Sequence, residues 1–296
     1  MADSNHAPTD APNRATRPWR VRLWEFTLTR IAVAFAFVAL PLAAVAIPMN
    51  LFVTHRGMKR LGALLLSAVV VAAYCAYVRL IEKRRPTEFS TSGALREVAC
   101  GVVLGALLFG LTIATLGAVG AYRVTGSNGW RAMLPAAAIF LVAAVAEEVA
   151  IRAILFRLLE ASLGTWIALA LSAGVFGLLH LFNPGATWLN TGAVSIEAGV
   201  LLAAAYLVTR RLWLCIGIHF AWNFAQGGIF SVAVSGNGQK GWLRSTLVGA
   251  DWLTGGAFGP EASVVALLVC SVAGGLLLWV ARRRGRFVQP YWKRRL

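Results

Sequence analysis

Long apolar segments separated by short polar ones make up most of this chain. A membrane-spanning helix needs about 20 consecutive, mostly apolar residues, and eight segments of the chain have roughly this length and character. They are residues 31–53, 61–78, 98–122, 133–155, 165–182, 191–208, 212–234 and 262–281. The pattern predicts an all-α polytopic membrane protein with about eight transmembrane helices in one bundle.

The composition agrees with a membrane protein rather than a soluble one. Hydrophobic residues make up 58% of the 296 residues and charged residues only 14%, with a mean hydropathy of +0.70, whereas soluble domains carry about 25% charged residues. The net charge of +16 comes from basic residues that cluster at the ends of apolar segments, where they anchor helices at the interface. We therefore expect a lipid bilayer around the protein and no binding to nucleic acid.

The distribution of basic residues also predicts how the chain is organised. We expect a disordered basic N-terminal tail over residues 1–24, a transmembrane domain over residues 25–285 and a basic C-terminal tail over residues 286–296. Lys and Arg favour the cytoplasmic side in short loops, and most basic clusters of the chain agree with both termini in the cytoplasm. The loop after the first apolar segment, with Arg56 and Arg60, disagrees with this orientation.

Three groups of polar residues interrupt the apolar segments. They are Glu147-Glu148 with Arg152, then His180, and then His219 with Asn223. An ionisable side chain at bilayer depth is costly and usually faces the interior of a bundle. Because each group lacks a polar partner in lipid, we expect the three helices to turn these side chains toward one another, so that they form one cluster.

The first group has the spacing of an ion pair on a helix. Glu148 and Arg152 are four residues apart and share one helix face, so we expect an ion pair between them. Glu147 points about 100° away from Glu148 and is left without that partner, which favours Glu147 as a general base. The alternative is a helix end at the membrane interface, with its charges extending into water.

The two histidines are less specific by themselves. Phe176 and His180 share a helix face, but a single histidine near the end of a span is more often structural. His219 and Asn223 are also four residues apart, and such a pair can bind a metal, bind a peptide carbonyl or bridge two helices. Residue counting separates Glu147 and His180 in depth by about 10 Å or more, unless a helix is tilted, begins elsewhere or continues beyond residue 182.

Taken in this order, the three groups resemble the CAAX-protease and bacteriocin-processing (CPBP) family of intramembrane proteases, which includes the type II CAAX prenyl endopeptidases. The family pattern is a Glu pair followed after three residues by Arg, then Phe-x-x-x-His, and then His-x-x-x-Asn, with a small residue as the alternative to Asn. This chain has Glu147-Glu148-x-x-x-Arg152, Phe176-x-x-x-His180 and His219-x-x-x-Asn223. The resemblance covers about residues 132–230, and residues 254–261 also resemble a segment of bacterial members.

The resemblance implies an intramembrane endopeptidase in a bacterial cytoplasmic membrane, with a role for each motif residue. Glu147 is expected to activate the attacking water with the help of His180. His219 and Asn223 are expected to stabilise the oxyanion of the tetrahedral intermediate. The supporting residues are Glu148, Arg152 and Phe176.

The resemblance also bears on cofactor and substrate. We expect no cofactor, with zinc as the open alternative, because a carboxylate and two imidazoles can ligate it. The zinc ligands would then be Glu147, His180 and His219, whereas Asn223 is a poor ligand for zinc. The expected substrate is a membrane-embedded or membrane-anchored protein or peptide, either CAAX-like or bacteriocin-like.

Two other functions are compatible with polar groups inside apolar helices. A proton- or ion-coupled transporter also uses Glu and His within its spans, although the chain has no internal repeat of the kind that many transporters show. A non-catalytic membrane scaffold is the third interpretation, since buried polar residues can specify helix packing. Glu197, in the sixth apolar segment, is not explained by the resemblance. It either pairs with a neighbouring helix, faces a water-filled cavity, or lines the path of the substrate.

Overall fold

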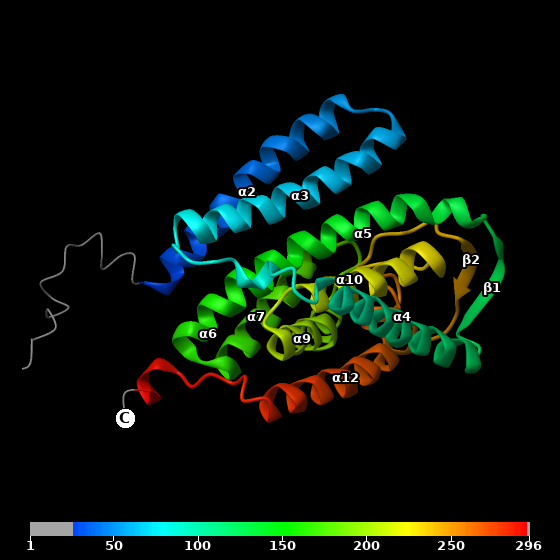
Figure 1. Ribbon diagram of the computed structural model, residues 1–296. Helices are drawn as coiled ribbons and strands as arrows, with labels where there is room; N and C mark the ends of the chain where they lie inside the picture. Colours follow the sequence, from blue (N-terminus) through cyan, green and yellow to red (C-terminus); the bar gives the residue numbers. More distant parts are fainter. Residues whose placement is uncertain (1–25, 295–296) are drawn as a thin grey trace, which may run out of the picture.

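The apolar segments of the chain form helices, because a backbone in lipid must satisfy its hydrogen bonds within its own segment. The computed structural model describes residues 26–294. Its long helices are α2 (Thr27–Phe52), α3 (Arg56–Leu80), α4 (Ala94–Ala118), α5 (Met133–Glu148), α7 (Thr165–Leu179), α10 (Trp213–Asn223) and α12 (Val264–Arg283) (Figure 1). The predicted all-α polytopic fold is confirmed.

Three helical stretches contain π-helical turns. The segment η4 (Val149–Phe156) joins α5 to α6 (Arg157–Leu163), η6 (Ser195–Val200) joins α8 (Trp188–Val194) to α9 (Leu201–Thr209), and η7 (Phe224–Ile229) extends α10. The shorter turns are η2 (Thr87–Phe89), η3 (Trp130–Ala132), η5 (His180–Phe182), α11 (Asp251–Thr254), η8 (Pro260–Ala262) and η9 (Tyr291–Lys293). Each π-helical turn contains or directly follows a polar residue of the apolar segments, and such turns are frequent at functional sites.

Within residues 26–294, six helical segments are long and apolar enough to cross a membrane: 27–52, 61–80, 94–118, 165–182, 188–209 and 264–283. The two other expected spans correspond to α5 with η4 and α10 with η7, which carry the Glu pair and the His219 motif. The total of eight spans therefore stays a prediction.

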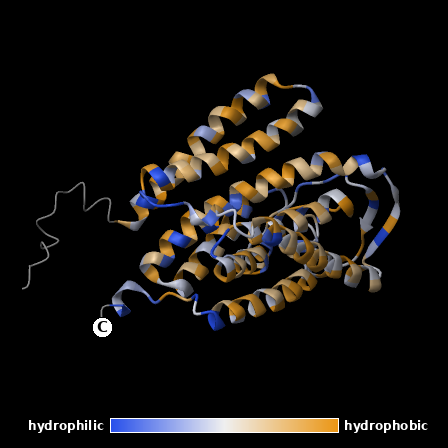
Figure 2. Ribbon diagram, viewed as in Figure 1, coloured by the Kyte–Doolittle hydropathy of each residue, from blue (hydrophilic) through white to orange (hydrophobic). Residues whose placement is uncertain are grey.

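The outer faces of the long helices are apolar, as a lipid environment requires (Figure 2). Large hydrophobic side chains such as Leu40 on α2, Leu107 on α4 and Val272 on α12 are exposed on the surface of the bundle. A water-soluble protein rarely exposes so continuous an apolar surface. The chain is therefore an integral membrane protein.

Helix α10, which carries His219, packs against α4 with little space between the two backbones. A Cβ atom at Gly217 would lie 2.6 Å from the carbonyl oxygen of Val98, and one at Gly101 would lie 2.5 Å from that of Leu214. Glycines at such positions let two membrane helices approach closely. This contact sets the position of α10 and, with it, the depth of His219 in the bundle.

A two-stranded antiparallel sheet, which the sequence pattern does not predict, joins two of the connections. The strand β1 (Tyr122–Ser127) follows α4 and pairs with β2 (Leu243–Leu247), which lies in the long connection between α10 and α12 (Figure 1). The pairing satisfies backbone groups of both connections. The long connection begins near Ser235 and returns to the bundle at Glu261, and these two residues hydrogen-bond to each other.

Ion pairs fasten the hairpin of α2 and α3 to the rest of the molecule. Arg30, Arg84 and Arg157 contact the carboxylate of Glu82 at 3.4, 2.7 and 2.8 Å, respectively. Burial acts to raise the pKa of Glu82, but the hydrogen bonds and charges of Arg157 and Arg84 outweigh it and lower the pKa below its ordinary value. The cluster thus joins α2, the loop after α3 and α6.

The described part of the C-terminal tail packs back onto the start of α7. The carbonyl oxygen of Val288 accepts a hydrogen bond from the backbone N–H of Thr165 at 3.0 Å, and the N–H of Val288 donates to Thr165 Oγ1 at 2.8 Å. The tail predicted for residues 1–24 lies outside the described residues, and the proposed division of the chain stays a prediction.

Candidate active site

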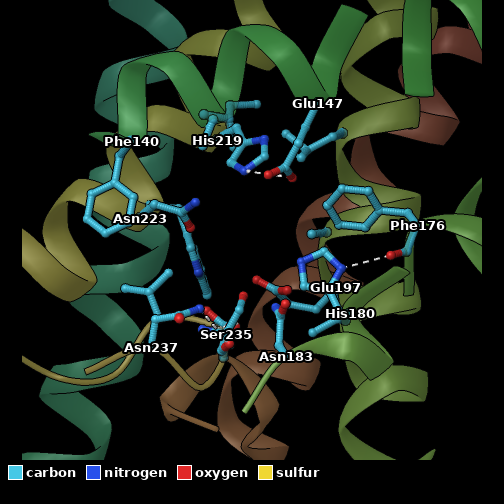
Figure 3. A pocket seen from close by; sticks show the side chains of 18 of the residues that line it. Phe140, Glu147, Phe176, His180, Asn183, Glu197, His219, Asn223, Ser235 and Asn237 are labelled. Atoms are coloured by element: carbon cyan, nitrogen blue, oxygen red, sulfur yellow. Dashed lines mark hydrogen bonds and ion pairs between the residues drawn. The ribbon is translucent and has the colours of Figure 1, made fainter. Parts of the chain in front are cut away.

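A cavity of about 390 Å³ lies where the polar groups of the apolar segments meet (Figure 3). The four residues to which the resemblance assigns chemistry all line it: Glu147 from α5, His180 from η5, and His219 and Asn223 from α10. Pockets of this size accommodate small ligands or a few residues of a peptide. The tertiary structure thus brings together side chains from α5, η5 and α10, which do not follow one another directly in the chain.

Arg152 and Glu148 form the ion pair that their spacing predicts. Nη1 of Arg152 donates to Glu148 Oε1 at 2.9 Å, and both side chains are fully buried. Nη2 donates to the carbonyl oxygen of Ala198 at 2.9 Å, and the guanidinium lies 4.7 Å from the centre of the Phe176 ring. Arg152 therefore joins η4 to η6 and α7, and the latter two segments line the cavity.

Glu148 also fixes the imidazole of His219. Nδ1 of His219 lies 2.8 Å from Glu148 Oε1, and because a carboxylate accepts, Nδ1 is the donor. Nε2 of the same ring faces the cavity and lies 3.8 Å from Glu147 Oε2. The sequence predicts only the ion pair of Glu148 with Arg152. In the structure, Oε1 of Glu148 accepts hydrogen bonds from both Arg152 and His219.

The imidazole of His180 is oriented by a backbone group. Its Nδ1 lies 2.8 Å from the carbonyl oxygen of Phe176, which can only accept, so Nδ1 carries the proton and the neutral ring keeps the lone pair of Nε2. The Phe176 ring packs against this imidazole, with 4.8 Å between ring centres, and lies 6.3 Å from that of His219. Phe176 thus packs near both imidazoles and against the guanidinium of the buried ion pair.

The adjacent carboxylates Glu147 and Glu148 have opposite surroundings. The side chain of Glu148 is fully buried, whereas that of Glu147 is 40% exposed and faces the cavity. Asn223 follows His219 by one helical turn and also lies on the cavity wall (Figure 3). The carboxylate of Glu147 is therefore accessible to a water molecule or a substrate in the cavity.

The difference in depth expected between Glu147 and His180 does not keep them apart, because both line the main cavity and a smaller one beside it. Helix α7 ends at Leu179 and the 3₁₀ turn η5 ends at Phe182. A continuation of this helix beyond Phe182, one of the arrangements considered from the sequence, is therefore wrong. The chain turns at the level of His180 instead.

The carboxylates and imidazoles of the cavity are not arranged as a ready metal site. Within residues 26–294, no three His, Cys, Asp or Glu side chains lie where they could together hold a metal ion. Zinc ligation by Glu147, His180 and His219 would require these side chains to move toward one another. A reaction without metal stays a prediction.

The cavity contains two further carboxylates that the motifs do not include. Glu197 on η6 and Glu261 on η8 both line the cavity and are each 3% exposed. Glu197 is recognisable in the sequence because it is an acidic residue in an apolar segment. Glu261 lies in a Gly-rich connection, and only the return of that connection to the bundle brings it to the cavity.

A comparison with protein families identifies the same part of the chain as the motifs do. Residues 128–225 match the family of type II CAAX prenyl endopeptidase, Rce1-like. The match includes all three motif groups and leaves α2, α3, α4 and α12 outside it. This is a family of proteases that act on membrane-associated proteins, and the resemblance inferred from the motifs is confirmed. No solved structure matches the chain.

Proposed function

We propose that this membrane protein is an intramembrane endopeptidase that hydrolyses a peptide bond of a membrane-associated protein or peptide, using a water molecule activated by Glu147. The observation that supports this most is the common cavity of Glu147, His180 and His219, which come from three different helical segments. Polar groups inside a membrane bundle are costly and usually functional. Their contacts leave one carboxylate and two ring nitrogens facing the space for a substrate.

Glu147 and His180 have complementary parts in activating the water. Glu147 is the exposed member of the Glu pair, so it takes a proton as the water oxygen attacks the carbonyl carbon. His180 donates a hydrogen bond from Nδ1–H to the Phe176 carbonyl oxygen. The lone pair of its Nε2 then accepts a hydrogen bond from the second hydrogen of the water. The proton on Glu147 then passes to the leaving amine as the peptide C–N bond breaks.

His219 and Asn223 stabilise the negative charge that develops on the carbonyl oxygen. The Asn223 amide donates from its NH₂ group, and His219 donates from Nε2 when its ring carries both protons. Glu148 at Nδ1 and Glu147 near Nε2 favour that positively charged ring. Preorganised donors of this kind contribute about 2.7–4 kcal/mol each to the transition state.

The substitution Glu147→Gln tests this function. It removes the base and keeps the shape of the side chain, so peptide cleavage should fall by about 100- to 10,000-fold while the protein still folds and inserts. New peptide termini in membranes that contain the wild type, but not the variant, are measured by mass spectrometry. Asp251→Asn, which alters an exposed carboxylate on α11, is the matched control and should cleave like the wild type.

Three outcomes would redirect the assignment. Wild-type turnover by Glu147→Gln would eliminate Glu147 as the base. Loss of cleavage under strong chelation, restored by added zinc, would assign Glu147, His180 and His219 as metal ligands, whereas we expect cleavage to persist. Ion flux in proteoliposomes, without cleavage of any membrane peptide, would favour a transporter.

A further inference from the structure

The wall of the cavity that carries Glu197 and Glu261 is acidic and is not used by the proposed reaction. Figure 3 shows Glu197 next to His180 and on the same side as Ser235. Glu261 comes from η8 and Glu197 from η6, segments that are far apart in the chain, and both side chains line the same cavity. Two carboxylates therefore face one small space.

Glu261 is held in place by the long connection that returns to the bundle. Its Oε1 accepts hydrogen bonds from the backbone N–H of Ser235 at 2.8 Å and from Ser235 Oγ at 2.7 Å. Both donors contact the same oxygen, and the side chain of Glu261 lines the cavity. Burial raises the pKa of Glu261 above its ordinary value, so in an empty cavity this carboxyl keeps its proton more readily.

Glu197 has much poorer partners. The one contact that its carboxylate makes among the described residues is with the thiol of Cys270, 3.8 Å from Oε1, and a thiol is a weak donor. Its side chain is almost completely buried, yet it lines the cavity, so Oε2 is an unpartnered oxygen directed at a space that a ligand can fill. Burying such a group is costly unless a cation or donor arrives.

The cavity supplies no permanent cation, and the two imidazoles that line it are already oriented by other partners, His180 by the Phe176 carbonyl and His219 by Glu148. The lining contains the three carboxylates of Glu147, Glu197 and Glu261 but no Lys or Arg, and the buried Arg152 is engaged by Glu148. A bound metal does not fit either, because no group of three suitable ligands is present in the described part of the chain. The missing positive charge must come from the molecule that enters.

Resting on the proposed function, we propose that Glu197 and Glu261 form a binding subsite for a positively charged group of the substrate, a Lys or Arg side chain close to the scissile bond. An ammonium or guanidinium group in the cavity can bridge the two carboxylates with charge-assisted hydrogen bonds. Because the cavity is small, this basic residue lies within a few residues of the bond that is cleaved. Peptides that bring a free carboxylate to the same place are repelled.

The test uses synthetic single-span peptides that are identical except for Lys, Gln or Glu at one position, which is moved along the sequence. Binding to the Glu147→Gln protein is measured first, because it does not depend on turnover. At the matching position we expect the Lys peptide to bind about 10- to 100-fold more tightly than the Gln peptide, and the Glu peptide to bind most weakly. Equal affinities for all three peptides at every position would overturn the subsite.

Variants of Glu197 and Glu261 then test whether these two carboxylates cause the preference for Lys peptides. Glu197→Gln and Glu261→Gln, made in the Glu147→Gln background, should each lose most of the preference for Lys and leave the affinity for the Gln peptide unchanged. An equal loss of affinity for the Lys and Gln peptides would show a structural role and overturn the proposal. Thermal unfolding of each variant separates this result from misfolding, and the Cys270→Ser variant, which keeps both carboxylates, should retain the preference.

Turnover distinguishes this inference from the proposed function. In the wild-type background the same two variants should raise KM for Lys peptides with little change in kcat, because the subsite binds the substrate at a distance from the reacting bond. A Lys preference in binding without any cleavage by the wild type would sink the protease assignment and leave the cationic subsite standing. Cleavage by the wild type without any preference for Lys peptides in binding would overturn the cationic subsite and leave the protease assignment standing.

Discussion

At the scale of single residues, the pair Glu147-Glu148 shows how two identical side chains acquire different roles. Helix geometry turns them about 100° apart, so one faces the interior and the other the cavity. Glu148 accepts hydrogen bonds from Arg152 and His219 and is fully buried. The carboxylate of Glu147 instead lies 3.8 Å from Nε2 of His219. Glu148 is thus a positioning residue, which orients His219 and neutralises Arg152.

Glu148→Gln should therefore destabilise the protein, although it keeps the size of the side chain. The substitution leaves the buried guanidinium of Arg152 without its counterion, and breaking a buried pair in this way costs about 3–5 kcal/mol. Thermal unfolding in detergent should show a clearly lower midpoint. Glu147→Gln alters a partly exposed carboxylate and should unfold close to the wild type, so equal midpoints for the two variants would contradict this account.

At the scale of helices, the contact between α4 and α10 determines where the His219 motif lies. The backbones meet at glycines, and no side chain separates them. The segment α10 carries His219 and Asn223 while α4 contributes nothing to the cavity lining. A change in the distance between these two helices therefore moves the proposed oxyanion donors relative to Glu147.

Gly217→Ala tests this coupling. The added Cβ would lie 2.6 Å from the carbonyl oxygen of Val98, so the helices must separate, at a cost of about 1–3 kcal/mol. We expect a lower unfolding midpoint together with slower cleavage. Gly110→Ala on α4 is the control, because a Cβ at Gly110 meets nothing within 4 Å. Equal unfolding midpoints for the two variants would show that the close approach of α4 and α10 does not determine the position of α10.

At the scale of the whole molecule, the hairpin of α2 and α3 lies to one side of the bundle that forms the cavity (Figure 1). Part of its attachment is electrostatic, through the cluster around Glu82. The first described helix begins, and the C-terminal segment ends, at the same end of the bundle (Figure 1). This arrangement supports our proposal that both termini lie on one side of a bacterial cytoplasmic membrane, with the basic flanks placing that side inside the cell.

The Glu82 cluster predicts a loss of stability in acid. Because the pKa of Glu82 is lower in the folded state than in the unfolded one, its contribution is complete above about pH 4.3, the ordinary value, and is lost as the pH falls through the folded pKa. The midpoint of thermal unfolding should fall by roughly 2–4 °C for each kcal/mol lost. The Glu82→Gln variant should have a lower unfolding midpoint at neutral pH, and this midpoint should fall less in acid. If the midpoint of the variant depended on pH as that of the wild type does, this explanation would be excluded.

Local properties of the chain were sufficient for much of the fold and part of the site. Apolar segments of the right length predict helices in lipid wherever they occur, and the spacing of Glu148 and Arg152 predicts their ion pair without knowledge of any other helix. The order of the motif groups predicted the resemblance to a protease family that residues 128–225 match. The β1–β2 sheet was missed, because its strands are short, lie in loops and pair across 116 or more residues of sequence.

The sequence by itself determined that this is a helical membrane protein with a small set of polar residues in apolar surroundings, since hydrophobicity and helical spacing depend only on neighbours along the chain. Only the tertiary structure decided that Glu148 accepts from His219, which is 71 residues away, that Glu147 is left facing the cavity, and that Glu197 and Glu261 meet on its wall. Those contacts depend on how the helices pack and where a long connection returns, and packing is set by the whole bundle at once.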